Sequence, residues 1–128
     1  MAGDTGVLTE RLDSQDMFGV TAAFPEQVEV AAGIAAGLEG LPSHDDIDSV
    51  LVTGMGGSGI AGDLVAAVSS PFLPVPMVVS KGYAPPGFVS PGTLCFAVSF
   101  SGNTEETIEA ALAAVAAGAR VVAVCRGG

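Results

Sequence analysis

The sequence predicts an α/β fold with a parallel sheet, and three observations support this prediction. Short apolar runs are bounded by Gly and Pro, helical stretches separate the runs, and Gly/Ser loops stand where a run gives way to a helix. Apolar runs without polar alternation are typical of strands that are buried on both faces. A strand, a helix and a second strand in succession predict right-handed parallel crossovers.

The N-terminal part of the chain is predicted to precede the sheet. We expect a flexible end over residues 1–8 and a helix from Pro25 to about Leu38, because proline is favoured in the first turn of a helix. The sequence therefore predicts two parts. Residues 1–24 form a flexible or short helical segment, and residues 25–128 form the ligand-binding domain.

Four strands and two helices are expected in the rest of the chain. The helices are expected over Ala61–Val68 and Thr104–Ala117, and Asn103 or Thr104 can cap the second one. The sequence stops directly after the fourth apolar run, so we expect a sheet truncated after its fourth strand, with one edge uncovered. The expected strands are 50–53, 76–80, 94–98 and 121–124.

Charge and hydropathy exclude two classes of partner. The formal net charge is −10, and nucleic-acid affinity rests mainly on Lys and Arg neutralising phosphates, so we expect no nucleic-acid partner. No apolar run approaches the roughly 20 residues of a membrane span, which predicts no membrane partner and a cytoplasmic protein. Cys95 and Cys125 lie in apolar runs and are expected to be reduced core residues.

Two Gly/Ser loops are the strongest indication of function. Gly54–Gly59 follows the first apolar run and Ser99–Thr104 follows the third. Helix N-termini offer unpaired N–H groups and a positive dipole end, so two such loops can converge on one phosphate. No acidic residue stands between Asp63 and Glu105, so this stretch does not repel an anion, although buried strands lack charges for structural reasons as well. The hydroxyl groups available to a phosphate are those of Ser58, Ser99, Ser101 and Thr104. Lys81 is a candidate for a secondary electrostatic contact, the alternative being a surface lysine whose charged end reaches solvent.

A dinucleotide site is the first alternative. Gly54, Gly56 and Gly59 satisfy the pattern G-x-G-x-x-G, which also requires an acidic residue about 20 positions later to bind the ribose. The second strand ends instead in Ser80 and Lys81. Lys81 would suit a 2′-phosphate, so an NADP site stays open, although this alternative leaves the second loop unexplained.

Other chemistries find less support in the sequence. There is no P-loop and no metal-ligand spacing, so we expect neither a cofactor nor a metal. Ile60 stands where a nucleophile elbow around Ser58 needs glycine, and the one histidine, His44, lies upstream in an acidic loop. Glu105 and Glu106 are candidate general bases by position, but acidic residues in a first helical turn are ordinary partners of the helix dipole.

The paired loops resemble the sugar isomerase (SIS) domain family, and within it the bifunctional phosphoglucose/phosphomannose isomerases. Gly56–Ile60 and Ser99–Thr107 are similar to the paired phosphate loops of that family. The segment Phe24–Gln27 and the turn Gly82–Tyr83 are similar too. The resemblance covers about residues 13–128, and the pair of loops is far more specific than either loop alone.

The resemblance implies a three-layer αβα fold and an aldose–ketose isomerase that interconverts glucose 6-phosphate and mannose 6-phosphate with fructose 6-phosphate. Family members are usually homodimers with two such domains in each chain, and their catalytic glutamate and histidine belong to later sequence. No catalytic residue is therefore assigned here. A non-catalytic module that senses phosphosugars is the alternative within the family. The residues that the resemblance assigns to phosphosugar binding are Gly56, Gly57, Ser58, Ser99, Ser101 and Thr104.

Overall fold

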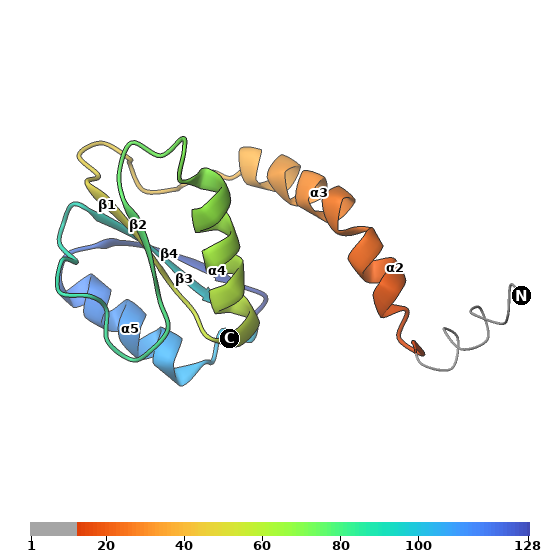
Figure 1. The fold of residues 1–128 in the computed structure, drawn as a ribbon. Helices are drawn as coiled ribbons and strands as arrows, with labels where there is room; N and C mark the ends of the chain where they lie inside the picture. Colours follow the sequence, from red (N-terminus) through yellow and green to blue (C-terminus); the bar gives the residue numbers. More distant parts are fainter. Residues whose placement is uncertain (1–12) are drawn as a thin grey trace, which may run out of the picture. The chain divides into compact units, whose positions relative to one another are not determined.

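The computed structural model describes residues 13–128 (Figure 1). The flexible end expected over residues 1–8 lies outside the described residues. The chain divides into two compact units that meet between Gly40 and Leu41. The boundary that the sequence predicts after residue 24 falls in the first turn of a helix and stays a prediction.

The first unit contains two consecutive helices, α2 (Met17–Ala22) and α3 (Phe24–Ala36). The Asp13 carboxylate accepts hydrogen bonds from the N–H groups of Met17 at 2.6 Å and Phe18 at 2.8 Å, which satisfies donors at the start of α2. Pro25 lies in the first turn of α3, as the sequence predicts.

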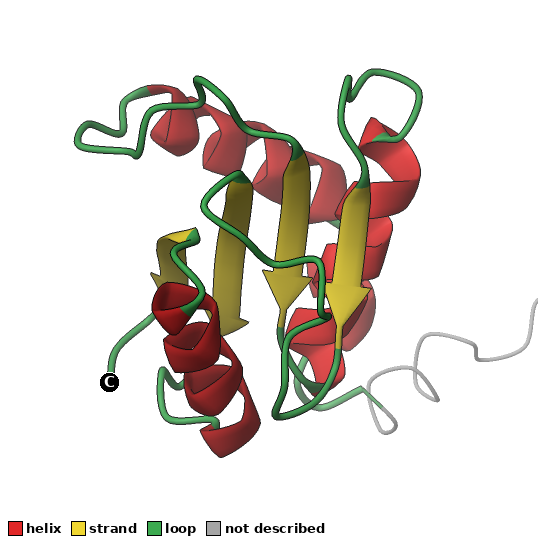
Figure 2. Cartoon of the chain, turned by 90° about the vertical axis from the view of Figure 1, so that its left-hand side faces the viewer, coloured by secondary structure: helices red, strands yellow, loops and turns green. Residues whose placement is uncertain are grey.

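The second unit is built on four parallel strands in the order β2-β1-β3-β4. Figure 2 shows the strands side by side, pointing the same way. All four expected strands are confirmed, with small differences at their ends. The strands are β1 (Ser49–Thr53), β2 (Met77–Ser80), β3 (Thr93–Ser99) and β4 (Arg120–Cys125).

Two helices cover opposite faces of the sheet, which makes the three-layer αβα fold (Figure 1). Side chains alternate between the faces along β1. Helix α4 (Gly56–Ser69) packs on the face of Val52, whereas α5 (Glu105–Ala116) packs with Leu51 and Cys95 on the other face. The expectation that α4 begins at Ala61 is wrong, because its glycine-rich first turn has low helix propensity and conceals the true start.

The sheet brings four strand exits to one edge. Thr53 at the end of β1 is in register with Ser80 of β2 and with Ala97 of β3, and Ser99 at the end of β3 is in register with Cys125 of β4. Ligands of open α/β sheets bind at this carboxyl edge. The connections that follow the four strands are therefore the place to look for a site.

Strand β4 is the least protected strand. It pairs with β3 alone among the described residues, and its Val124 side chain is 48% exposed. Cys125 is also exposed, so the expectation of a core residue is wrong at this position. Cys95, on the more central β3, is buried, and burial raises the pKa of its thiol to about 11. Both cysteines are free.

No helix among the described residues is long and apolar enough to cross a membrane. Residues 13–128 also contain no group of three or more His, Cys, Asp or Glu side chains arranged to hold a metal ion.

Candidate functional site

The first loop turns the chain from the end of β1 directly into α4. Met55 has an extended backbone, with φ of −110° and ψ of 158°, and Gly56 follows at φ +51°, a conformation that favours glycine. The carbonyl oxygen of Met55 accepts hydrogen bonds from the N–H groups of Ser58 at 3.0 Å and Gly59 at 3.2 Å. The N–H groups of Gly56 and Gly57 precede these bonds, so they have no intrahelical partner and are available to an anion.

The glycines of this loop meet two different requirements. A Cβ on Gly54 would lie 2.9 Å from the carbonyl oxygen of Val98, so the exits of β1 and β3 come into close contact here. A Cβ on Gly56 or Gly57 would instead meet no atom within 4 Å. Close packing therefore accounts for Gly54, whereas Gly56 and Gly57 border open space that a ligand can occupy.

The second loop arranges its hydroxyl groups through hydrogen bonds within the loop. The hydroxyl oxygens of Ser99 and Thr104 lie 2.9 Å apart, and Ser99 Oγ also accepts the N–H of Gly102 at 3.1 Å. Ser101 Oγ accepts the N–H of Asn103 at 3.1 Å. An acceptor hydroxyl keeps its own proton for donation. The proton of Ser101 and one proton of the Ser99–Thr104 pair are thus available to phosphate oxygens.

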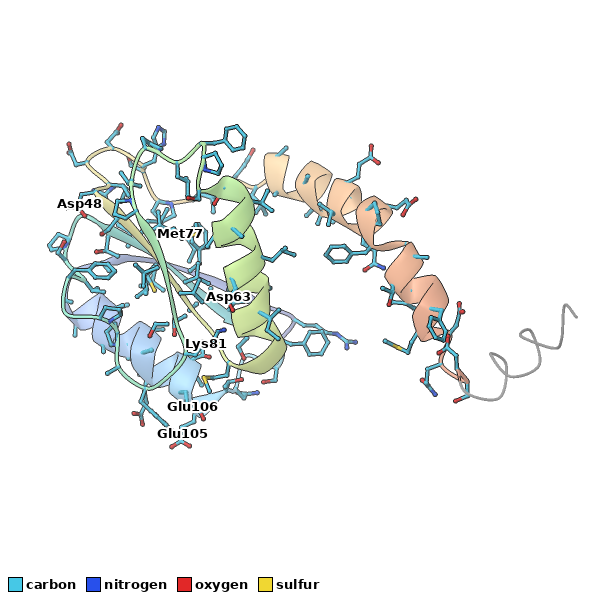
Figure 3. All side chains as sticks on the ribbon, viewed as in Figure 1. Asp48, Asp63, Met77, Lys81, Glu105 and Glu106 are labelled. Atoms are coloured by element: carbon cyan, nitrogen blue, oxygen red, sulfur yellow. The ribbon has the colours of Figure 1, made fainter. Side chains whose placement is uncertain are left out.

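Helix α5 begins beside these hydroxyl groups. Its N-cap residue is Thr104, one of the two caps that the sequence predicts, but the side chain makes no capping hydrogen bond and contacts Ser99 instead. The first-turn N–H groups of α5 therefore lack a side-chain cap, which leaves a second helix N-terminus open to an anion. Glu105 and Glu106 occupy the first turn, where they complement the helix dipole (Figure 3).

Tyr83, in the connection after β2, lies near the start of α5. The carboxylates of Glu106 and Glu105 raise the pKa of the Tyr83 phenol, because a negative phenolate beside two negative groups is unfavourable. The connection after the outer strand β2 thus extends toward the loop that follows β3.

Lys81 is held beside the first loop by an ion pair. Its Nζ contacts a carboxylate oxygen of Asp63 on α4 (Figure 3), and its Cε would lie 2.9 Å from a Cβ on Gly59. The two side chains are 42% and 49% exposed, and such exposed pairs are worth about 0–1 kcal/mol. The ion pair offsets part of the Lys81 charge, for a 2′-phosphate and for a sugar phosphate alike. Lys81 stays a predicted secondary contact.

The structure thus gathers all the predicted binding residues at one edge of the sheet. They belong to the segments that follow β1, β2 and β3, and their roles in binding stay predictions. His44 precedes β1 and therefore belongs to the opposite, amino edge. The segment after β4 lies at this edge too, because Gly102 contacts Gly127. From the sequence alone, Arg126 at the end of this strand could face either the pocket or solvent.

Fold and site together define a doubly wound α/β domain with two hydroxyl-bearing loops at the carboxyl edge of its sheet. Comparison with known proteins gives the family: the sequence model described as SIS domain matches residues 45–128. The chain belongs to the SIS domain family. The predicted family resemblance is confirmed.

The chain is similar to several curated bifunctional phosphoglucose/phosphomannose isomerases. It is 38% identical to one from Caldicellulosiruptor bescii over 112 residues, which cover 88% of this chain and 33% of the relative. It is 45% identical to one from Thermoplasma acidophilum over 80 residues, which cover 62% of this chain and 25% of the relative. The chain thus spans a quarter to a third of the length of these relatives.

A solved structure shares the fold as well. A Bacillus subtilis protein assigned to the phosphosugar isomerases superimposes with a TM-score of 0.54 at 26% sequence identity. The match covers 62% of this chain and 26% of the other. It supports the SIS-type arrangement of sheet and helices independently of the sequence matches.

Proposed function

We propose that this chain supplies the phosphosugar-binding domain of an aldose–ketose isomerase that interconverts glucose 6-phosphate and mannose 6-phosphate with fructose 6-phosphate. One observation carries the proposal: two hydroxyl-bearing loops meet at one sheet edge, beside the open space over Gly56 and Gly57. The names of the curated relatives supply the reaction. We propose residues 25–128 as the extent of this domain; the family match covers residues 45–128 of it, and the second compact unit covers residues 41–128.

The proposed binding roles divide between hydroxyl and backbone groups. Ser58, Ser99, Ser101 and Thr104 donate to the phosphate oxygens, and the N–H groups of the Gly56–Gly57 pair face the same ligand. A hydrogen bond to a charged group contributes about 1.5–3 kcal/mol, whereas an exposed helix terminus contributes about 0.3–1 kcal/mol. The hydroxyl groups therefore dominate the affinity.

The proposed reaction needs more groups than the described residues supply. Moving a proton between C1 and C2 through an enediol requires a base, an acid that opens the sugar ring, and a group that stabilises the enediolate. We assign none of these roles. Phosphate anchoring still contributes to the rate, because binding energy remote from the reacting carbons orients them. We propose that the complete enzyme is a cytoplasmic homodimer and that this chain alone binds without turnover.

Calorimetric titration of the chain with fructose 6-phosphate tests the proposal, with NADPH titrated in parallel. We expect heat of binding with the sugar phosphate and none with NADPH. Binding of NADPH alone would instead show that the first loop is a dinucleotide turn. A folded protein that binds neither ligand would also contradict the proposed function.

Two serine variants locate the binding event. Ser101→Ala should weaken the affinity for fructose 6-phosphate by about 1.5–3 kcal/mol, since it removes a hydroxyl donor to a charged group. Ser43→Ala is the matched control, because Ser43 Oγ also accepts the N–H of the residue two positions later, at 3.1 Å, but lies before β1. Equal affinities of the two variants would remove Ser101 from the site.

A further inference from the structure

The segment that follows β4 contacts the second loop at two places. The N–H of Arg126 donates to the carbonyl oxygen of Phe100 at 3.1 Å. Gly102 has φ of +74°, and a Cβ there would overlap the carbonyl oxygen of Gly127. The backbone on both sides of Ser101 is therefore in contact with the segment after β4.

The Arg126 side chain lies over the ring of Phe100. Its guanidinium carbon is 5.6 Å from the ring centroid, and Phe100 is 71% exposed. Phe100 stands between Ser99 and Ser101, two of the proposed phosphate ligands. This is a cation–π contact, which holds the guanidinium near the second loop without using up its charge. Arginine can also bind a phosphate in a bidentate way through its planar N–H donors.

Arg126 also differs from the other described cations in its partners. Lys81 is paired with Asp63, and Arg120 donates from Nη1 to the carbonyl oxygens of Ser43 and Asp45, at 2.6 Å each. Among residues 13–128, no carboxylate lies within ion-pair distance of Arg126. Its positive charge is thus available to an anionic ligand at the carboxyl edge.

We propose that Arg126 contacts the phosphate of the ligand and that Phe100 positions its guanidinium for this contact. The inference rests on the proposed function and adds a cation to a site otherwise built from hydroxyl and N–H groups. The cation matters because the chain carries a net charge of −10, which repels a phosphate dianion at long range. A direct arginine contact opposes that repulsion where the ligand binds.

The test compares Arg126→Gln with Arg120→Gln in the full chain. Both changes make the net charge more negative by one, but Arg120 begins β4 at the amino edge, whereas Arg126 follows its carboxyl end. The control therefore matches the change in net charge and leaves the carboxyl edge intact. We expect Arg126→Gln to weaken the binding of fructose 6-phosphate by about 10- to 100-fold and Arg120→Gln to leave it within about twofold. Inorganic phosphate should show the same contrast, since the contact is to the phosphate. Added salt should narrow the difference, because it screens a direct charge contact.

The outcomes separate the inference from the proposed function. Wild-type binding with equal affinities of the two variants would overturn the role of Arg126 and leave the proposed function standing. A loss for fructose 6-phosphate without a loss for inorganic phosphate would also overturn it, because Arg126 would then contact the sugar. A wild-type chain that binds neither ligand would overturn both proposals.

A second variant keeps the test valid if Arg126→Gln does not fold. Arg126→Lys retains the charge but not the planar fork, so we expect a several-fold loss of affinity and a retained salt dependence. Unchanged affinity in a folded Arg126→Lys protein would contradict the bidentate contact. Thermal unfolding of each variant, followed by circular dichroism, shows whether it is folded.

Discussion

Gly59 lies so close to Gly54 that a Cβ on Gly59 would be 2.7 Å from the Gly54 carbonyl oxygen. Both residues are buried, and both belong to the turn from β1 into α4. The contact sets how near the first turn of α4 can approach the end of β1. It therefore fixes the position of the open glycines between them.

The first prediction concerns this contact. Gly59→Ala should lower the free energy of unfolding by about 1–3 kcal/mol, because the added methyl group meets a backbone carbonyl that cannot rotate away. Urea unfolding followed by circular dichroism measures the change. A variant as stable as the wild type would show that α4 moves at little cost.

The second prediction concerns Gly57, two positions earlier, where there is open space. Gly57→Ala should stabilise the fold by roughly 0.5–1 kcal/mol, since alanine is the better helix former. The same methyl group fills the space above the loop, so the affinity for fructose 6-phosphate should fall at least tenfold. Urea unfolding and calorimetry measure the two effects separately. Undiminished binding by a folded Gly57→Ala protein would place the ligand elsewhere.

The third prediction compares two fully buried threonines on neighbouring strands. Among the described residues Thr53 Oγ1 has no hydrogen-bond partner, whereas Thr93 Oγ1 lies 3.0 Å from Ser49 Oγ and accepts the N–H of Ser90 at 3.0 Å. Thr53→Val should be neutral or stabilising. Thr93→Val should cost about 1–3 kcal/mol, because it removes the acceptor of the half-buried Ser90 N–H and the partner of Ser49 Oγ. Equal effects of the two variants in urea unfolding would contradict this assignment of partners.

The fourth prediction follows from the buried thiol of Cys95. Burial raises the pKa of this thiol to about 11 in the folded protein, whereas the pKa of a cysteine thiol in an unfolded chain is about 8.5. Above the lower pKa the unfolded state loses its proton first, so stability should be complete below it and fall as the pH rises toward the folded pKa. Unfolding midpoints measured across this pH range should show the decline in the wild type, and Cys95→Ala should remove part of it.

Thiol labelling provides a second readout of the same environment. Cys125 is exposed and should react with a thiol reagent in the folded protein, whereas Cys95 should react only after unfolding. Rapid labelling of both thiols in native conditions would show that β3 is accessible to solvent. The Cys125→Ser variant assigns the fast reaction.

Much of the fold could be predicted because it depends on local patterns. Each strand is a short apolar run with a clear end, and Pro25 indicates the first turn of α3. The start of α4 could not be found in this way, since a run of glycines has no helical signal of its own. Cys125 was misplaced because an apolar run does not reveal whether its strand is central or at the edge of the sheet.

The site was predictable as a set of loops but not as a set of contacts. The position of each Gly/Ser loop after a strand depends only on the order of the elements. The ion pair of Lys81 with Asp63 and the approach of Gly127 to Gly102 depend on how separate segments pack. Those contacts bear directly on the charge of the site, which is why the sequence could not distinguish the roles of Lys81 and Arg126.

The strand order has a consequence for how the protein folds. β1 is central, and its two neighbours follow it at different distances along the chain, with Ser49 contacting Thr93 across 44 positions. Closing such long loops is slow, because the chain loses conformational entropy before the contacts between the paired strands contribute favourable free energy. The two loops at the carboxyl edge come together only when β1 and β3 have paired. A ligand that bridges the two loops would therefore bind only to a chain in which β1 and β3 have already paired. It would stabilise the native state in proportion to the logarithm of its concentration.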